Sequence, residues 1–135
     1  MIKFLNLYKQ DKTILPSFLK ELRTLLRKND FILGNKVTEF EKNFSKFCNS
    51  KFAVGVANGT DALTIALNSL NLKKDSEVII PAMTYCSTAF AVINANLKPV
   101  LVDIEKDSPT IDITKLKKKI NSKTKVIMPV HLYGS

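Results

Sequence analysis

A short polar turn in the middle of the sequence has the residue types needed to bind a phosphate group. Asn58, Gly59, Thr60 and Asp61 follow the apolar run FAVGV (52–56) and precede a segment with helical apolar spacing. A strand that leads through such a turn into a helix leaves free N–H groups, and the positive end of the helix dipole, at the strand's carboxyl edge. Gly59 allows close approach to the backbone, and the Thr60 hydroxyl can cap the helix or bind a phosphate oxygen. An ordinary capped turn explains the spacing equally well, since the glycine patterns of the common nucleotide-binding loops are absent.

Two further side chains with chemical potential follow later apolar runs. Tyr85 comes shortly after Pro81, which ends the run EVII (77–80), and its ring could stack on a planar cofactor or pack in the core. His131, the only histidine, follows the run KVIMPV (125–130), and a lone histidine there is more often structural than catalytic. Ligands of open α/β sheets bind beyond the carboxyl ends of the strands, so we expect the turn and these two residues at one edge.

Four short β-rich runs that alternate with helical segments predict an α/β fold with a mainly parallel sheet. The runs are FAVGV (52–56), EVII (77–80), PVLVD (99–103) and KVIMPV (125–130). The helices between them are expected at an apolar stripe of Leu63, Ala66, Leu67 and Leu70, at about Ser87 to Asn94, and after Asp112 or Thr114 with Leu116 and Ile120 turned inward. The runs are apolar on both faces, which is typical of buried parallel strands.

The first part of the chain is expected to be helical. One helix has apolar residues at three- and four-residue steps from Leu15 to Leu26, and a second has a stripe of Val37, Phe40, Phe44 and Phe47. Thr38 and Glu41 have the spacing of a capping box at the start of this second helix. We therefore divide the chain into a helical segment, 1–50, and a partial α/β cofactor-binding large domain, 51–135.

Charge and composition exclude several classes of function. The net charge is +9, and its densest stretch is KLKKKINSKTK (115–125), which we interpret as a solvated helix face because it has no aromatic or arginine residues for nucleic-acid contacts. No apolar run is long enough to span a membrane. Cys48 and Cys86 lie far apart without a CxxC pattern, which predicts buried thiols in a reducing cytoplasm and no metal site.

A series of strings in a fixed order carries a resemblance to a known family. The strings are FILGNKVTEFEKNF, KFAVGVANGTDAL, SEVIIPAMTYCSTAFAV, KPVLVDI and TKVIMPVHLYG. Together they resemble the DegT/DnrJ/StrS family of pyridoxal-phosphate-dependent sugar aminotransferases, which have the aspartate-aminotransferase (type I) fold. The resemblance extends along the whole chain. It implies the N-terminal part of a type I large domain.

The resemblance also implies a site. Gly59, Thr60 and Asp61 would hold the phosphate of pyridoxal 5′-phosphate, and Tyr85 would stack on its ring. The FILG segment and the N-terminal helices would lie near the mouth of the active site and at the interface of a homodimer, whereas His131 would lie near the cofactor without an assigned step. Asn71 and Asn96 stand where the family usually has glycine, and asparagine tolerates the left-handed conformation there.

The implied reaction moves an amino group from glutamate or glutamine to the keto group of a nucleotide-linked sugar, as in cell-surface polysaccharide or amino-sugar biosynthesis. The chain is expected to lack the C-terminal part of the large domain, with the Schiff-base lysine beyond Ser135, and therefore to be inactive alone. Three alternatives stay open. The first is a sugar dehydratase of the same family, and the second is a nucleotide- or phosphate-binding α/β module without catalysis. The third is a regulatory or degenerate relic.

Overall fold

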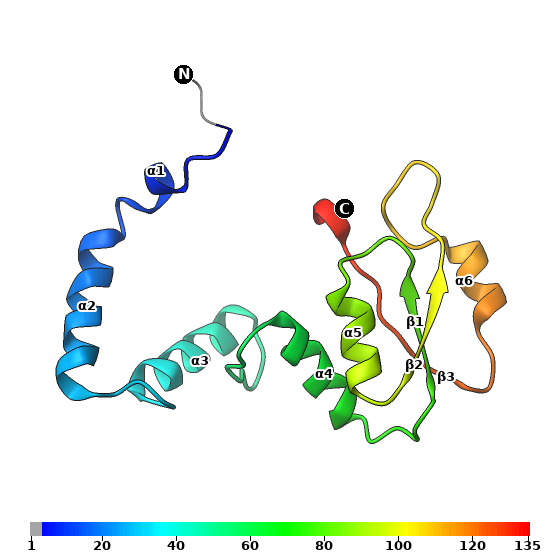
Figure 1. Cartoon of the computed structure of the whole chain (residues 1–135), viewed down its shortest axis with the longest axis horizontal. Helices are drawn as coiled ribbons and strands as arrows, with labels where there is room; N and C mark the ends of the chain where they lie inside the picture. The colour runs from blue at the N-terminus through cyan, green and yellow to red at the C-terminus, as the bar shows by residue number, and fades with distance from the viewer. Residues whose placement is uncertain (1–3) are drawn as a thin grey trace. The chain divides into compact units, whose positions relative to one another are not determined.

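A computed structural model describes residues 4–135 of the chain (Figure 1). The chain divides into two units, Met1–Gly55 and Val56–Ser135, of which the first is described from residue 4 onward. The second unit contains a parallel sheet of three strands: β1 (Glu77–Pro81), β2 (Lys98–Val102) and β3 (Thr124–Ile127). The strand order is β2-β1-β3, so β1 is the central strand. The α/β class and the parallel sheet predicted from the sequence are confirmed.

Helices cover both faces of this sheet. Val78 and Ile80 of β1 pack with α4 (Gly59–Ser69) and α5 (Ser87–Asn94), chiefly through Leu67 and Val92. Ile79, which points to the opposite face, packs with α6 (Ile113–Lys119) through Leu116. All three β1 residues are completely buried, as expected for a central strand with an apolar layer on each side. A short 3₁₀ helix, η1 (Leu132–Gly134), follows β3.

Several sequence-based boundaries in this unit are confirmed. Helix α5 has the predicted bounds, and the Asp112 carboxylate caps α6 by accepting hydrogen bonds from the N–H groups of Thr114 and Lys115 at 2.8 and 3.0 Å. Asn71 and Asn96 have φ angles of 48° and 57°, the left-handed conformation expected where glycine is usual.

The predicted strand at 52–56 is wrong. These residues form no strand, and Phe52 and Val54 are exposed to 75% and 78%. A strand exists only when a neighbour completes its hydrogen-bonding ladder, and within residues 4–135 none of the strands pairs with this segment. Residues 52–56 therefore have the composition of a strand but, in the described part of the chain, no neighbouring strand with which to pair. The sheet consequently has three strands rather than four.

The first unit contains α1 (Leu7–Asp11), α2 (Leu15–Lys28) and α3 (Asn35–Phe47). The predicted capping box is wrong, because α3 begins before Thr38, with Gly34 as the N-cap residue. The Asp30 carboxylate caps this end instead, accepting a hydrogen bond from the Asn35 N–H at 3.2 Å. Glu41 lies inside the helix and accepts a hydrogen bond from the Gly55 N–H at 2.7 Å.

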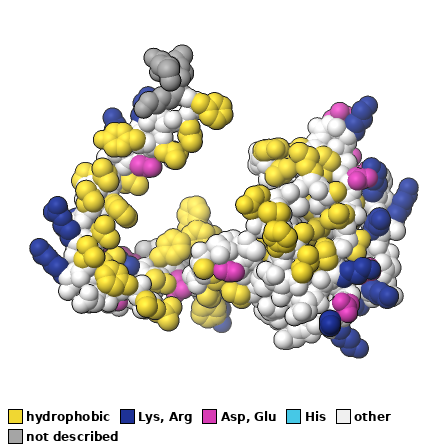
Figure 2. Space-filling view, viewed as in Figure 1, with side chains coloured by type: hydrophobic (Ala, Val, Ile, Leu, Met, Phe, Trp, Pro, Cys, Tyr) yellow, Lys and Arg dark blue, Asp and Glu magenta, His cyan; other side chains and the backbone are white. Residues whose placement is uncertain are grey.

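The apolar stripes predicted for these helices exist but are exposed. Figure 2 shows hydrophobic side chains gathered along α2 and α3. The exposed apolar residues of these helices include Phe18, Leu22, Phe40 and Phe44. Cys48 and Cys86 are also exposed, so the prediction of buried thiols is wrong. Ile120 is another correction: α6 ends at Lys119, so Ile120 leaves the helical face and is half exposed.

Candidate functional site

The turn at residues 58–61 forms the amino end of α4. Asn58 is the N-cap residue, and its side-chain oxygen accepts a hydrogen bond from the Asp61 N–H at 2.9 Å. Its amide nitrogen donates to the Asp61 carboxylate, also at 2.9 Å. The two side chains thus hold each other, which fixes the first turn of the helix.

Two backbone N–H groups at this helix end remain free. Within residues 4–135, the N–H groups of Gly59 and Thr60 have no acceptor. The Asn58 side chain caps the following N–H group instead, that of Asp61. A Cβ atom placed on Gly59 would meet no other atom within 4 Å, so the space beside its Cα is open. Free donors, the positive helix end and open space are the features of an anion-binding backbone. We name residues 58–60 the α4 cradle.

A hydrogen bond between hydroxyl groups connects the α4 cradle to the start of α5. Thr60 Oγ1 donates to Ser87 Oγ at 2.9 Å, in a partly buried position. Because α5 follows the carboxyl end of β1, this bond places the cradle at the carboxyl edge of the sheet, as the sequence predicts. The sequence pattern does not predict that Ser87 lies beside this turn, because the bond joins residues 27 positions apart.

Tyr85 lies in the loop between β1 and α5, two residues before Ser87. Its side chain is 73% exposed, which excludes the alternative that the ring packs in the core. Its carbonyl oxygen accepts a hydrogen bond from the Thr88 N–H at 3.0 Å, and Thr88 is buried. The backbone at Tyr85 is therefore held in place while its ring remains available to a ligand.

His131 lies after β3 and is exposed. Its Nδ1 lies 2.9 Å from the carbonyl oxygen of Ser135, a contact that holds the turn of η1. No hydrogen bond within residues 4–135 connects the His131 ring to the α4 cradle. These contacts agree with a structural rather than a catalytic role for His131.

The lysines of α6 are exposed, as predicted, but Lys115 is also paired. Its Nζ lies 3.1 Å from the carboxylate of Asp103, which follows β2. The hydrogen bond that Lys115 donates to Asp103, together with the negative charge of Asp103, raises the pKa of Lys115 above its usual value. The amine is therefore held in its protonated form, which is a poor nucleophile.

Two classes of site have no support in the described part of the chain. Among residues 4–135, no group of three or more His, Cys, Asp and Glu side chains is arranged to hold a metal ion. No helix in the same residues combines the length and the apolar character needed to cross a bilayer. The cytoplasmic location and the lack of nucleic-acid binding stay predictions from the sequence.

The chain is similar in sequence to a curated sugar transaminase. It is 37% identical over 134 residues to the dTDP-3-amino-3,6-dideoxy-alpha-D-galactopyranose transaminase of Aneurinibacillus thermoaerophilus. The match covers 99% of this chain but only 37% of that relative. The chain thus spans little more than a third of the length of the protein it matches.

Solved structures share its fold. S. venezuelae DesV, solved in complex with a ketimine intermediate, superposes with a TM-score of 0.91 and 34% identity over 98% of this chain and 36% of DesV. The E. coli GDP-4-keto-6-deoxy-D-mannose-3-dehydratase, solved with bound hydrated PLP, gives a TM-score of 0.78 and 32% identity over 86% of this chain and 31% of that enzyme.

The family model of the DegT/DnrJ/EryC1/StrS aminotransferases matches residues 12–135, nearly the whole chain. The match includes the α4 cradle, Tyr85 and all three strands of the sheet. By sequence and by fold, this chain belongs to the DegT/DnrJ/EryC1/StrS aminotransferase family.

Proposed function

We propose that the chain forms the phosphate-holding part of a pyridoxal 5′-phosphate enzyme that aminates a keto group on a nucleotide-linked sugar. The observation that carries this proposal is the α4 cradle, where Gly59 and Thr60 have free N–H groups and the space beside Gly59 is open. A phosphate group fits this arrangement, because its oxygens need donors and it is stabilised by a positive helix end. The similarity to the Aneurinibacillus transaminase and to DesV supports the same assignment.

Each site residue then has a distinct role. The N–H groups of Gly59 and Thr60 bind phosphate oxygens, and the exposed ring of Tyr85 covers one face of the cofactor ring. Asp61 is tied to Asn58 and acts by fixing the turn, since a carboxylate next to a phosphate would repel it. When bound, the cofactor supplies an aldehyde that carries the amino group from glutamate or glutamine to the sugar.

We infer that Lys98, Lys115 and Lys125 do not serve as the Schiff-base lysine of the reaction. Lys98 is the first residue of β2 and Lys125 the second of β3, at the edge opposite the α4 cradle. Lys115 is paired with Asp103 and protonated. We therefore expect no amino transfer by the chain alone.

The complete enzyme is proposed to be a homodimer. The exposed apolar stripes of α2 and α3 support this, because large apolar patches on a folded surface mark interaction sites.

A hybrid protein tests the proposal. In it, this chain replaces the matching segment of the Aneurinibacillus transaminase, and the same hybrid with Thr60→Val and Gly59→Ala serves as the matched control. We expect the hybrid to bind the cofactor and to transfer an amino group from glutamate to a dTDP-linked keto sugar, and the control to bind the cofactor at least tenfold more weakly, on the order of 1.4 kcal/mol. Turnover by the chain alone would contradict the assignment of the missing lysine. Equal cofactor binding by a folded hybrid and its control would contradict the role of the α4 cradle.

The dehydratase of the same family is the second candidate, because the E. coli dehydratase shares this fold. The cradle and Tyr85 serve both reactions equally. Release of water from a 4-keto-6-deoxy sugar nucleotide, without transfer of nitrogen to the product, would identify the dehydratase in an assay of the protein joined to its own downstream sequence. Amino transfer in the same assay would identify the transaminase.

A further inference from the structure

Asn58 and Gly59 form a dipeptide that can undergo a chemical modification without an enzyme. In asparagine deamidation, the backbone nitrogen of the following residue attacks the side-chain amide carbon and expels ammonia. Glycine favours this attack, because it has no Cβ atom to shield its nitrogen and its backbone rotates most freely. Asn58 is the only asparagine of the sequence that precedes a glycine, and it lies at the start of α4.

The structure leaves the attacking nitrogen of Gly59 accessible. Within residues 4–135 its N–H group has no acceptor, and a Cβ atom placed on Gly59 would meet nothing within 4 Å. Asn58 and Gly59 are both exposed, so the water that completes the reaction also reaches them. Nothing around the nitrogen therefore opposes the attack.

Two asparagines that precede a serine show the opposite situation. At 49–50, the attacking group is occupied, because the Ser50 N–H donates to the Ser45 carbonyl at 2.9 Å. At Asn121 the side chain is held in place, since its Nδ2 donates to Glu77 Oε2 at 2.8 Å. Asn58 differs from both in having glycine as its neighbour and a free N–H group beside it.

The reactive side chain of Asn58 is restrained by Asp61 alone. Asn58 Oδ1 accepts a hydrogen bond from the Asp61 N–H, and Nδ2 donates to the Asp61 carboxylate, both at 2.9 Å. The Asn58 backbone is extended, with a ψ angle of 175°. Closure of the succinimide ring brings the side-chain carbon onto the Gly59 nitrogen, so the side chain and the backbone must both rotate and the two bonds must break. Their loss raises the barrier to the reaction in the folded chain.

We propose that Asn58 is a site of spontaneous deamidation that Asp61 holds in check. The Gly59 nitrogen forms a bond to Asn58 Cγ, the Cγ–Nδ2 bond breaks, and ammonia leaves with the hydrogen of the Gly59 amide. Water then opens the succinimide at either of its carbonyl groups and gives aspartate or isoaspartate at this position. Water is the only co-reactant, and nothing is oxidised or reduced.

The product loosens the turn that Asn58 caps. Its new carboxylate has no hydrogen to donate to the Asp61 carboxylate, and the two negative charges repel each other. Isoaspartate also adds a carbon atom to the backbone directly before α4 and so moves the capping oxygen relative to the Asp61 N–H. The lifetime of the Asn58 amide therefore limits the lifetime of the native turn. These steps need no bound cofactor, so they are independent of the proposed function.

The experiment follows the loss of the Asn58 amide in the 135-residue chain at mildly alkaline pH, in native protein and in protein unfolded by urea. Peptide mapping by mass spectrometry separates asparagine, aspartate and isoaspartate at each position. Asp61→Ala removes the acceptor of Nδ2, Asp61→Asn keeps an oxygen there, and Gly59→Ala shields the attacking nitrogen. Asn121 in the same samples is the internal control, since its side chain is held by Glu77.

In the native wild type, Asn58 should deamidate about a hundredfold more slowly than in urea, because both bonds to Asp61 must break. Native Asp61→Ala should deamidate about tenfold faster than the native wild type, whereas the two should react equally fast in urea. Asp61→Asn should resemble the wild type, and Gly59→Ala should retain its amide under both conditions. The rate at Asn121 should be the same in every native protein.

Three results would overturn the proposal. The first is an equal rate at Asn58 in the native and the unfolded wild type, which would exclude a restraint by the fold. The second is an unchanged native rate in Asp61→Ala while Asn121 also keeps its rate, which would exclude Asp61 as the restraining residue. The third is faster formation of isoaspartate at another asparagine in urea. The comparison of native with unfolded wild type needs no substituted protein, so it decides the restraint even where a parallel rise at Asn121 shows that Asp61→Ala has unfolded.

Discussion

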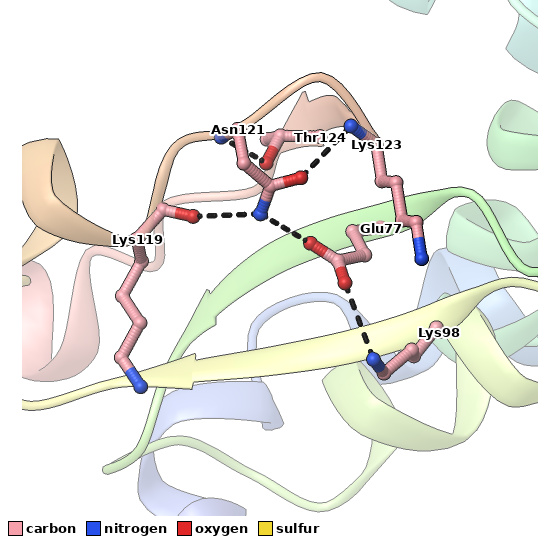
Figure 3. A network of polar contacts seen from close by, with 6 residues as sticks. All are labelled: Glu77, Lys98, Lys119, Asn121, Lys123 and Thr124. Atoms are coloured by element: carbon pink, nitrogen blue, oxygen red, sulfur yellow. Dashed lines mark hydrogen bonds and ion pairs between the residues drawn. The ribbon is translucent and has the colours of Figure 1, made fainter.

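Glu77 Oε2 accepts a hydrogen bond from Asn121 Nδ2 at 2.8 Å, between residues separated by 44 positions in the sequence (Figure 3). The other carboxylate oxygen pairs with Lys98 Nζ at 3.2 Å, and the Glu77 N–H donates to the Lys123 carbonyl at 2.9 Å. Glu77 is buried at the start of the central strand, and its partners lie at the starts of β2 and β3. One carboxylate therefore joins the amino ends of all three strands.

Because of these contacts, stability should depend on pH through Glu77. The hydrogen bond from Asn121, and next that from Lys98, lower the pKa of Glu77 below its ordinary value of 4.5. A lowered folded-state pKa means that the unfolded chain takes up protons first, so stability falls as the pH drops from 4.5 through the folded pKa. Urea unfolding at pH 7 and pH 3 should show a loss in the wild type that is smaller in Glu77→Gln.

Part of this acid sensitivity should remain in Glu77→Gln. The pKa of Asp112 is also lowered, first by the hydrogen bond from the Thr114 hydroxyl and then by that from the Lys115 N–H, so it acts in the same direction. The double variant with Asp112→Asn should have the flattest profile. An unchanged pH dependence in Glu77→Gln would contradict the role given to this carboxylate.

Two glycine substitutions should have opposite effects. A Cβ atom on Gly59 meets nothing within 4 Å, so Gly59→Ala should change the free energy of unfolding by less than about 1 kcal/mol. The added methyl group would occupy the space proposed for the phosphate, and binding of pyridoxine 5′-phosphate should fall about tenfold or more. Calorimetry and the binding titration check the two effects separately.

Gly34→Ala is the matched substitution in the other unit. Its Cβ would overlap the Asp30 carboxylate and lie 2.9 Å from the Asp30 carbonyl oxygen, so the turn before α3 must shift, at a cost of about 1–3 kcal/mol. Phosphate binding should not change. A loss of binding in Gly34→Ala as large as in Gly59→Ala would show that the effect at Gly59 is not local.

Tyr85→Ala should affect binding more than folding. The ring is 73% exposed, so its removal should change the free energy of unfolding by no more than about 0.5 kcal/mol. Loss of stacking should weaken the binding of pyridoxine 5′-phosphate by about 1 kcal/mol, whereas Tyr85→Phe should keep it. Since inorganic phosphate has no ring, its binding should be the same in all three proteins; a weaker binding in Tyr85→Ala would contradict the stacking role.

The central strand should carry the stability of the sheet. Ile79 of β1 is completely buried against α6, so Ile79→Ala should lower the free energy of unfolding by about 2–5 kcal/mol. Leu101, a residue of the same size class on β2, is 56% exposed, and Leu101→Ala should cost less than about 1 kcal/mol. Urea midpoints measured under the same conditions compare the two. Equal losses would contradict the placement of β1 at the centre.

Exposed apolar side chains should make the isolated chain self-associate. Phe40 and Phe44 are 58% and 47% exposed on α3, and their rings are stacked at 5.5 Å between centroids. Sedimentation velocity should show association that increases with concentration, and Phe40→Glu should reduce it because a charge would be buried in the contact. A monomer at every concentration would be the contradictory result.

The sequence predicted those parts of the fold that depend on local patterns. The bounds of α5, the Asp112 cap and the left-handed conformations of Asn71 and Asn96 follow from side chains close in sequence. The failure at 52–56 has a physical reason: apolar β-rich residues favour a strand, but only a neighbouring strand completes it. Ile120 was misplaced because helix ends depend on caps that its pattern does not show.

Some features of the candidate site could likewise be predicted from the sequence, and others required the structure. The turn at Gly59 and Thr60 could be found from the strand-turn-helix pattern, and Tyr85 from its place after Pro81. Ser87 could not, because its bond to Thr60 joins residues 27 positions apart and depends on how α4 and α5 pack. The exposure of Tyr85, which separates stacking from core packing, also needed the structure.

The central claim, that the α4 cradle holds a phosphate group, is tested most directly by amide NMR of the chain during titration with pyridoxine 5′-phosphate. We predict saturable shifts that are largest at the N–H groups of Gly59 and Thr60, the two free donors of the helix end. Shifts confined to the lysine-rich segment 115–125, or no saturable shift at Gly59 and Thr60, would contradict the claim.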